Sequence, residues 1–315
     1  MERYLKRRKM SKRIVFMGTP SYATVIFAKL LEKNFNVVAL FTQSDKKVGR
    51  KQELTPPHIK QYCLDHNINL PIYQPQRLRD NQEMVDALYS LKPDFIVVAA
   101  YGQILPKSIL DIAPCINLHA SLLPKYRGAS PIQEALLHDD EYTGVTAMLM
   151  EEGLDTGDIL GFKYLKITPT LEVAQAFETL SHVAADLTIE TLNHFSSLNP
   201  LPQNSALSSL CKKIKKEEGE VDFSDAKALV LKYKAYSFWP GVFLSSGLKL
   251  KGITLVDETL AHQAGEILAI NKESVVVGCA TGAIEIKTLQ APSKKELSSV
   301  DYFRGQRLQV GDILA

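Results

Sequence analysis

The chain has 315 residues, more than the roughly 250 to 300 that one hydrophobic core usually serves, so we expect two domains. Apolar residues make up 45% of the sequence and charged residues 23%, which argues against a collagen-like, mucin-like or wholly disordered chain. The 37 Lys and Arg residues against 35 Asp and Glu leave a net charge of +2. Any nucleic-acid partner would therefore have to meet locally clustered positive charge.

Seven positive residues precede the first apolar run, against one acidic residue, Glu2. A solvated extension over residues 1–10 is the commoner meaning of such a charge run, and a phosphate-binding arm is the alternative. The positive residues are Arg3, Lys6, Arg7, Arg8, Lys9, Lys12 and Arg13.

Residues 11–195 alternate short apolar runs with helical patterns, which is typical of a mostly parallel sheet covered by helices. The sequence therefore predicts an α/β domain in this region. The predicted strands are 14–17, 37–42, 95–100, 116–119 and 144–150, and the predicted helices are 22–33, 57–66, 82–91, 131–138 and 171–195.

Residues 196–209 are rich in Ser, Asn, Pro and Leu without periodicity, which predicts a linker. In residues 210–315, one helix is predicted at 226–236, and five short β-rich runs are separated by Gly, Asn or charged turns. This pattern indicates a small closed β-barrel of the oligonucleotide-binding (OB-like) kind. The five runs are 242–244, 249–256, 266–270, 274–279 and 283–289.

The turn after the first strand reads Gly18-Thr19-Pro20. It lacks the second glycine that lets a backbone approach a pyrophosphate, and Pro20 removes an amide donor. This disfavours an NAD-dependent dehydrogenase. The sequence contains no G-x-x-x-x-G-K-[ST] motif either, so a P-loop nucleotide hydrolase is unsupported.

The four cysteines are widely spaced, without a CxxC pair, and this indicates neither a zinc site nor a disulfide scaffold. We expect no metal, and a reducing cytoplasm fits best. No apolar run approaches the roughly 20 residues that cross a bilayer, so we expect a cytoplasmic protein without a membrane partner. The cysteines are Cys63, Cys115, Cys211 and Cys279.

Two segments carry polar side chains where a ligand site is expected. In the predicted strand 116–119, alternation places Asn117 and His119 on one face, and ligands of α/β sheets bind outside the carboxyl ends of such strands. The loop 153–158 offers Asp155 and Asp158 between glycines. An ordinary turn is the alternative for that loop, since Asp and Gly are common turn residues.

These segments resemble the folate-dependent formyltransferase family, and the resemblance covers residue 14 to the C-terminus. Residues 41–43, 216–219 and 239–241 are similar more specifically to the members that act on methionyl-tRNA. The shared motifs are Asn117-x-His119, Ser121-Leu122-Leu123-Pro124, Arg127-Gly128-Ala129-Ser130-Pro131-Ile132 and Gly153-Leu154-Asp155-Thr156-Gly157-Asp158.

The resemblance implies a Rossmann-like formyltransferase domain. It also implies transfer of the formyl group of N10-formyltetrahydrofolate, a co-substrate, to the α-amino group of methionine on initiator methionyl-tRNA, for translation initiation. In this family match, Asn117 donates to the developing oxyanion. His119 moves the proton from the attacking nitrogen towards N10 of the folate, and Asp155 stabilises the charged imidazole ring.

The resemblance also implies where the two substrates bind. Folate would lie against Ser121, Leu122, Leu123 and Pro124, and its pterin would contact the backbone near Val98, Ala100, Tyr101 and Gly102.

The tRNA acceptor end would meet a basic loop at residues 42–57, which we expect to be structureless; Arg50 is its key residue, with Lys46, Lys47 and Lys51 beside it. Residues 210–315 would form a second tRNA-binding region, because residues 211–251 carry nine lysines against five acids. We expect a monomer.

Two other functions remain open at this point. The same chemistry could act on a small amine, such as glycinamide ribonucleotide or an amino-sugar nucleotide. Alternatively, the chain could be a non-catalytic RNA-binding protein on a decayed enzyme scaffold, although the presence of Asn117, His119 and Asp155 together argues against decay.

Overall fold

The computed structural model describes residues 12–49 and 51–314. The predicted extension at 1–10 and Arg50 lie outside the described residues. The chain divides into two compact units, each described by itself. Unit 1 comprises the chain up to Gly128, Thr143–Leu165 and Phe177–Leu210, and unit 2 comprises Ala129–Tyr142, Lys166–Ala176 and the chain from Cys211. The domain boundaries predicted from the sequence stay predictions.

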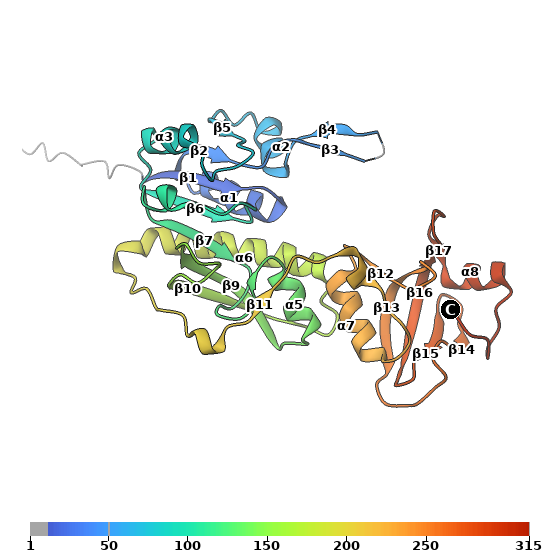
Figure 1. Cartoon of the computed structure of the whole chain (residues 1–315). Helices are drawn as coiled ribbons and strands as arrows, with labels where there is room; N and C mark the ends of the chain where they lie inside the picture. The colour runs from blue at the N-terminus through green and yellow to red at the C-terminus, as the bar shows by residue number, and fades with distance from the viewer. Residues whose placement is uncertain (1–11, 50, 315) are drawn as a thin grey trace, which may run out of the picture. The chain divides into compact units, whose positions relative to one another are not determined.

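Unit 1 is built on a seven-stranded sheet (Figure 1). Four strand pairs are parallel, β1 with β2, β1 with β6, β2 with β5 and β6 with β7, while β7 and β9 run antiparallel. The predicted mostly parallel α/β sheet is therefore confirmed. In sheet order the strands are β10 (Ile159–Lys166), β9 (Tyr142–Leu149), β7 (Cys115–His119), β6 (Phe95–Ala99), β1 (Arg13–Gly18), β2 (Asn36–Phe41) and β5 (Ile72–Tyr73).

Helices cover both faces of this sheet because its central strands are apolar on both sides. On one face, Phe16 packs on Phe27 of α1. On the other face, Val15, Val98 and Leu88 belong to one buried cluster, so α3 lies there. The helices wholly in unit 1 are α1 (Ser21–Glu32), α2 (His58–Asp65), α3 (Gln82–Ser90) and α4 (Lys107–Leu110); α5 (Pro131–Leu137) belongs to unit 2, and α6 (Val173–His194) lies mostly in unit 1.

The turn between β1 and α1 needs a glycine for packing. A Cβ on Gly18 would lie 2.5 Å from the Ala23 Cβ and 2.9 Å from the Ala99 carbonyl oxygen. The chain therefore passes close to β6 at the carboxyl edge of the sheet. This is the edge at which β7 also ends, and where α/β sheets bind their ligands.

The loop expected to be structureless at residues 42–57 instead contains a hairpin, so that prediction was wrong. Strands β3 (Lys46–Val48) and β4 (Glu53–Thr55) pair antiparallel, and the hairpin projects from unit 1 in Figure 1. Gly49 and Gln52, which flank the turn, both adopt positive φ. Glycine adopts such angles at little cost. The strand residues are exposed, so no alternation of buried apolar residues indicated this strand pair in the sequence.

Unit 2 contains an antiparallel sheet, which confirms the predicted β-rich class; its closure into a barrel stays a prediction. The sheet runs in the order β12, β13, β16, β15, β14, with β17 beside β16. A helix after the last strand was not predicted: α8 begins where the Ser298 side chain accepts from the Asp301 amide. The elements are α7 (Ala226–Tyr236), β12 (Val242–Phe243), β13 (Lys249–Asp257), β14 (Ile267–Ile270), β15 (Val275–Gly278), β16 (Ala283–Gln290), β17 (Leu297–Ser298) and α8 (Ser299–Gln306).

Short elements complete the chain. Strands β8 (Arg127–Gly128) and β11 (Leu210–Cys211) are two residues long, and 3-10 helices cover Phe195–Ser197, Ser205–Leu207 and Lys216–Gly219. Among the described residues, no helix is both long and apolar enough to span a bilayer.

Candidate active site

The strand β7 carries two of the predicted catalytic residues to the carboxyl edge of the sheet. Asn117 lies opposite Val98 of β6 and Met148 of β9, and His119 lies opposite Thr146. Because side chains alternate along a strand, Asn117 and His119 share one face. His119 is buried, with 6% of its surface exposed.

Asp155, from the loop after β9, meets both of them. Its Oδ1 accepts a hydrogen bond from Asn117 Nδ2 at 3.3 Å, and its Oδ2 lies 3.6 Å from His119 Nδ1. Oδ2 also accepts from the backbone N–H of Gly128 at 2.9 Å. The side chain of Asp155 is only 13% exposed, so water screens these interactions weakly. The structure thus brings the three predicted catalytic side chains together, while their roles stay predictions.

A backbone carbonyl fixes the orientation of the His119 ring. Nε2 lies 2.8 Å from the carbonyl oxygen of Tyr126. A carbonyl can only accept, so Nε2 carries a proton. Nδ1 is the ring atom that faces Asp155. The Tyr126 carbonyl and the Gly128 amide were not predicted from the sequence, although both lie in or beside the motif that begins at Arg127.

The backbone at this site adopts conformations that L-residues rarely take. Asp155 has a φ of 51° and Tyr126 a φ of 58°. Non-glycine residues in the left-handed region cost about 1 to 3 kcal/mol each and persist only where their surroundings hold them. Contacts that hold these two residues are therefore expected around the site.

The predicted folate-binding loop after β7 is fastened to β9. The hydroxyl of Thr146 donates to the carbonyl of Ser121 at 2.7 Å and accepts from the Leu123 amide at 3.1 Å. The buried Ser121 hydroxyl donates to the Lys125 carbonyl at 2.6 Å. Leu122 and Pro124, the other members of this motif, are half-buried. The loop is a fixed surface, and its contact with folate stays a prediction.

The second predicted folate surface follows β6. Val98 is buried in the core, between Met17 of β1 and Asn117 of β7, whereas Ala100 is exposed. The carbonyl of Tyr101 accepts from Gln43 Nε2 at 3.1 Å. Gly102 adopts a φ of 79°, a left-handed conformation that glycine takes at little cost, and a Cβ there would lie 2.3 Å from that same nitrogen.

Tyr101 also holds an unsatisfied polar group. The residue is 1% exposed, and its hydroxyl has no hydrogen-bond partner among residues 12–49 and 51–314. The ring belongs to a buried cluster against which Leu110 and Met150 pack. Those two residues in turn line a cavity of about 330 Å³, whose other lining residues are Lys107, Asp111, Glu151, Glu152 and Gly153. A cavity therefore lies beside the loop that leads to Asp155.

The predicted tRNA-binding lysines lie apart from this site. Lys46 and Lys47 are on β3 and Lys51 is in the turn, all exposed. In the described part of the chain, no hydrogen bond or ion pair joins them to the three catalytic candidates. Lys46 Nζ donates to the Gln43 side chain at 2.7 Å, which connects the base of the hairpin to the Tyr101 carbonyl.

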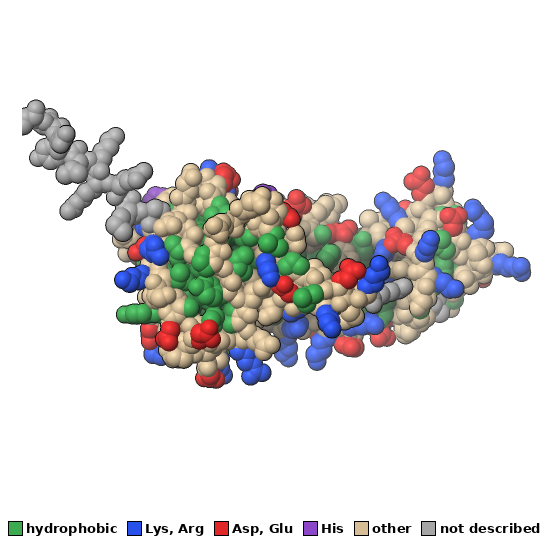
Figure 2. All heavy atoms as spheres, turned by 90° about the horizontal axis from the view of Figure 1, so that it is seen from above, with side chains coloured by type: hydrophobic (Ala, Val, Ile, Leu, Met, Phe, Trp, Pro, Cys, Tyr) green, Lys and Arg blue, Asp and Glu red, His purple; other side chains and the backbone are tan. Residues whose placement is uncertain are grey.

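In unit 2, both signs of charge are spread over the surface shown in Figure 2. Several lysines of the segment 211–251 are already engaged. Lys227 pairs with Asp139 at 3.1 Å, and Lys251 pairs with Glu296. Lys234 is buried, which lowers the pKa of its ammonium group. The lysines left exposed and close together are Lys212, Lys213, Lys215 and Lys216.

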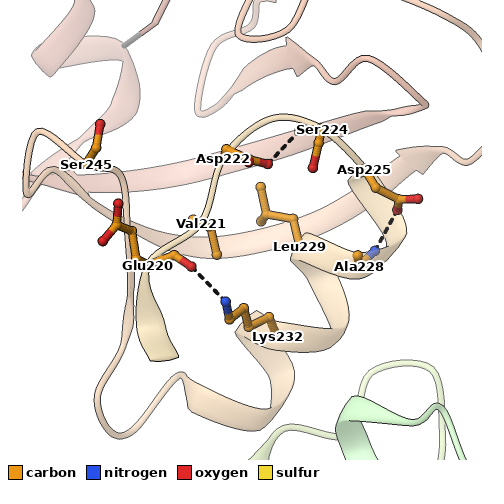
Figure 3. A pocket seen from close by; sticks show the side chains of 9 residues that line it. All are labelled: Glu220, Val221, Asp222, Ser224, Asp225, Ala228, Leu229, Lys232 and Ser245. Carbon is orange, nitrogen blue, oxygen red and sulfur yellow. Dashed lines mark hydrogen bonds between the residues drawn. The ribbon is translucent and has the colours of Figure 1, made fainter. Parts of the chain in front are cut away.

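A larger cavity of about 460 Å³ lies in unit 2 at the start of α7 (Figure 3). Its polar groups bind one another. Lys232 Nζ donates to the carbonyl of Glu220 at 2.7 Å, and Asp225 accepts from the Ala228 amide at 2.8 Å. Asp222 Oδ1 likewise accepts from the Ser224 amide at 2.9 Å, so three of the four charged side chains that line the cavity are engaged by its own residues.

Comparison with known proteins gives two family matches. The model described as formyl transferase matches residues 12–192, and the model described as formyl transferase, C-terminal domain, matches residues 213–307. The chain belongs to the formyl transferase family. The resemblance stated from the sequence motifs is confirmed.

Similar members of the formyl transferase family include two bacterial proteins named methionyl-tRNA formyltransferase. The one from a Nitratiruptor species is 57% identical over 300 residues, which is 95% of this chain and 99% of that protein. The one from Wolinella succinogenes is 55% identical over 303 residues, covering 96% of this chain and 99% of that protein.

Two solved structures show the same fold at low identity. HypX from Aquifex aeolicus in complex with tetrahydrofolic acid matches with a TM-score of 0.63 and 19% identity, covering 93% of this chain and 47% of that one. The N-formyltransferase from Helicobacter canadensis in complex with folinic acid and dTDP-3-aminofucose matches with a TM-score of 0.67 and 17% identity, covering 89% of this chain and 100% of that one.

Proposed function

We propose that this formyl transferase moves the formyl group of N10-formyltetrahydrofolate to the α-amino group of methionine on initiator methionyl-tRNA, for translation initiation. The observation that carries the proposal is the meeting of Asn117 and His119 at the carboxylate of Asp155. The names of relatives that are 55% and 57% identical over nearly the whole chain support the choice of substrate.

Asn117 is the group that meets the developing negative charge. When the amine nitrogen attacks the formyl carbon, a new C–N bond forms and the formyl oxygen becomes anionic. One N–H of the Asn117 amide is engaged by Asp155, and the second N–H has no partner among the described residues and would donate to that oxygen. Such a donor contributes about 10² to 10³ in rate.

His119 is the group that moves the proton. The attacking nitrogen must lose a proton, and N10 of the folate must gain one as the bond between N10 and the formyl carbon breaks. Nδ1 of His119, beside Asp155, would carry that proton, a role that typically contributes about 10² to 10⁴ in rate. The Asp155 carboxylate stabilises the ring while it is charged.

The donor of the formyl group is a co-substrate, and it supplies an activated one-carbon unit. The residues present suit it, because the cavity at Leu110 and Met150 adjoins the cluster in which the Tyr101 hydroxyl is unpaired. A buried hydroxyl without a partner is costly, and a polar group of the folate that reached the Tyr101 hydroxyl would relieve that cost. The fastened loop at Ser121 and Leu123 would form the opposite side.

For the tRNA, we propose that the exposed lysines of the β3–β4 hairpin and Lys212 to Lys216 contact phosphates. Binding through lysines weakens as salt rises, because counterions are released. We further propose that the protein acts in the cytoplasm as a monomer.

The deciding experiment is formylation by the purified protein with N10-formyltetrahydrofolate and three acceptors: methionyl initiator tRNA, glycinamide ribonucleotide and an amino-sugar nucleotide. We expect formylation of the methionyl-tRNA alone. Preferential formylation of a small amine would mean that this amine, and not methionyl-tRNA, is the acceptor. No formylation of any amine would favour a non-catalytic RNA-binding role.

A further inference from the structure

The segment 201–210, between the two regions that the family models match, is fastened along unit 1. Leu201 exchanges two backbone hydrogen bonds with Ile159, at 2.8 and 2.9 Å, and the carbonyl of Ser209 accepts from the Arg127 amide at 2.8 Å. Composition alone predicted a linker here. Hydrogen bonds hold this segment against Ile159 of β10 and the motif that begins at Arg127, and its role as a linker between domains stays a prediction.

Gln203 lies in this segment and uses both ends of its side chain. Its Nε2 donates to the carbonyls of Asp155 and Gly157, each at 2.8 Å. Its Oε1 accepts from the Nε and Nη2 of Arg127 at 3.0 and 2.8 Å. Arg127 is 7% exposed, so its buried guanidinium group fixes the Gln203 side chain, which in turn binds the Asp155 loop.

The two carbonyls depend on this contact. In the described part of the chain, no backbone N–H donates to the carbonyl of Asp155 or of Gly157. The backbone of Asp155 is in the left-handed region, where a non-glycine residue must be held by its surroundings. A Cβ on Gly157 would lie 1.8 Å from the Leu149 carbonyl, so the loop is also pressed against β9.

We propose that Gln203 is a positioning residue for catalysis: it holds the Asp155 backbone so that the carboxylate faces His119, Asn117 and the Gly128 amide. The inference rests on the proposed function, and Gln203 itself would touch neither substrate. The contact between Asp155 Oδ2 and His119 Nδ1 is 3.6 Å, so a small retreat of the loop ends it. A misplacement of about 1 Å can cost about 10²-fold in rate.

The test uses Gln203→Glu in the full-length protein. A carboxylate still accepts from Arg127, but it places an oxygen against two carbonyl oxygens, which repels the loop. We expect kcat for formylation of methionyl initiator tRNA to fall by about 10- to 100-fold, with KM for both substrates changed less than about threefold. The matched control is Gln82→Glu, on an exposed turn of α3 where Gln82 donates to Asp86; its kcat should stay within about twofold of the parent.

A double substitution separates positioning from general damage. If Gln203 acts through the carboxylate, Gln203→Glu should lower kcat less than about twofold in the Asp155→Asn background, because residues that act as a unit are not additive. Equal losses in the two backgrounds would overturn the inference.

A second readout needs no activity. Hydrogen exchange at the Gly128 amide, which donates to Asp155 Oδ2, should quicken by at least about tenfold in Gln203→Glu. The Leu123 amide, bonded to Thr146, should stay unchanged. Unchanged exchange at Gly128 would refute the positioning role even in an active enzyme.

If the parent formylates no amine, the proposed function fails, and the Gly128 exchange still decides the role of Gln203. Should Gln203→Glu not fold, the same measurements are made on Gln203→Met. This variant removes both sets of hydrogen bonds without adding a charge, and the same outcomes are expected of it.

Discussion

Replacing Asp155 by asparagine changes one atom and the charge while keeping the shape of the side chain. The carboxylate accepts from Asn117 through Oδ1 and from Gly128 through Oδ2, and Oδ2 also faces His119. An amide has one accepting oxygen. If its NH2 group takes the Oδ2 position, it meets the Gly128 N–H donor. If it takes the Oδ1 position, it meets the NH2 group of Asn117 and turns that side chain away from its proposed role.

The size of the effect follows from these contacts. Two unit charges about 4 Å apart interact by roughly 4 kcal/mol at an effective dielectric constant of 20, and desolvation of the charges offsets part of this. The loss of charge stabilisation at His119 together with one mismatched donor should raise the activation barrier by about 3 to 4 kcal/mol. This corresponds to about 10²- to 10³-fold in kcat. KM for the folate should change much less, because the contacts that are lost join Asp155 to protein groups and not to the folate.

Steady-state formylation of methionyl initiator tRNA, at saturating and varied folate, measures kcat and KM separately. Asp158→Asn is the matched control, since it makes the same chemical change three residues along the same loop, and it should keep kcat within about twofold. A large rise in KM for folate with kcat intact in Asp155→Asn would make Asp155 a binding residue. Nearly normal kcat and KM would remove Asp155 from the mechanism.

Asn117→Ala should fold normally and lose about 10² to 10³ in kcat, measured by formylation and by circular dichroism; near-normal turnover would contradict its role. Tyr101→Phe deletes a buried, unpaired hydroxyl. The free energy of unfolding should therefore stay unchanged or rise by up to about 1 kcal/mol, and KM for folate should rise. Lower stability in urea titrations would refute this prediction. Burial raises the pKa of the Cys115 thiol from 9.0 to about 12. The unfolded chain releases that proton at lower pH than the folded chain, so the free energy of unfolding falls as the pH rises from 9 towards 12, and it should fall less steeply in Cys115→Ala. The same dependence of the free energy of unfolding on pH in the parent and in Cys115→Ala would contradict this prediction. Replacing Lys46 and Lys47 by Ala should raise KM for tRNA and weaken the dependence of that KM on salt, with KM for folate unchanged. An unaltered KM for tRNA would exclude both lysines from tRNA binding.

The α/β class of unit 1 was predictable because its strands are apolar on both faces. In β6, every residue from Phe95 to Ala99 is buried, and such runs between helical patterns indicate a parallel sheet. The β3–β4 hairpin was not predictable in this way. Its strands are three residues long and exposed, so the pairing rests on backbone hydrogen bonds and turn geometry, which leave little trace in hydropathy.

The active-site residues also divide into those that a local sequence pattern predicts and those that it does not. Alternation along β7 placed Asn117 and His119 on one face correctly, because period-two geometry is local. From its residues alone the loop of Asp155 is better interpreted as an ordinary turn, and only the family resemblance singled it out. In the structure the carboxylate meets Asn117 across 38 residues of sequence, a distance over which no local pattern carries information.

Gln203 shows the limit of composition as a guide to function. A segment rich in Ser, Asn, Pro and Leu without periodicity predicts a linker. Hydrogen bonds from side chains to carbonyls need no apolar face, however, and Gln203 reaches Asp155 from 48 residues away. A polar segment beside a strained loop can therefore stabilise the active conformation without contributing to the core. Substitution of Gln203 should accordingly lower kcat while changing the free energy of unfolding only slightly.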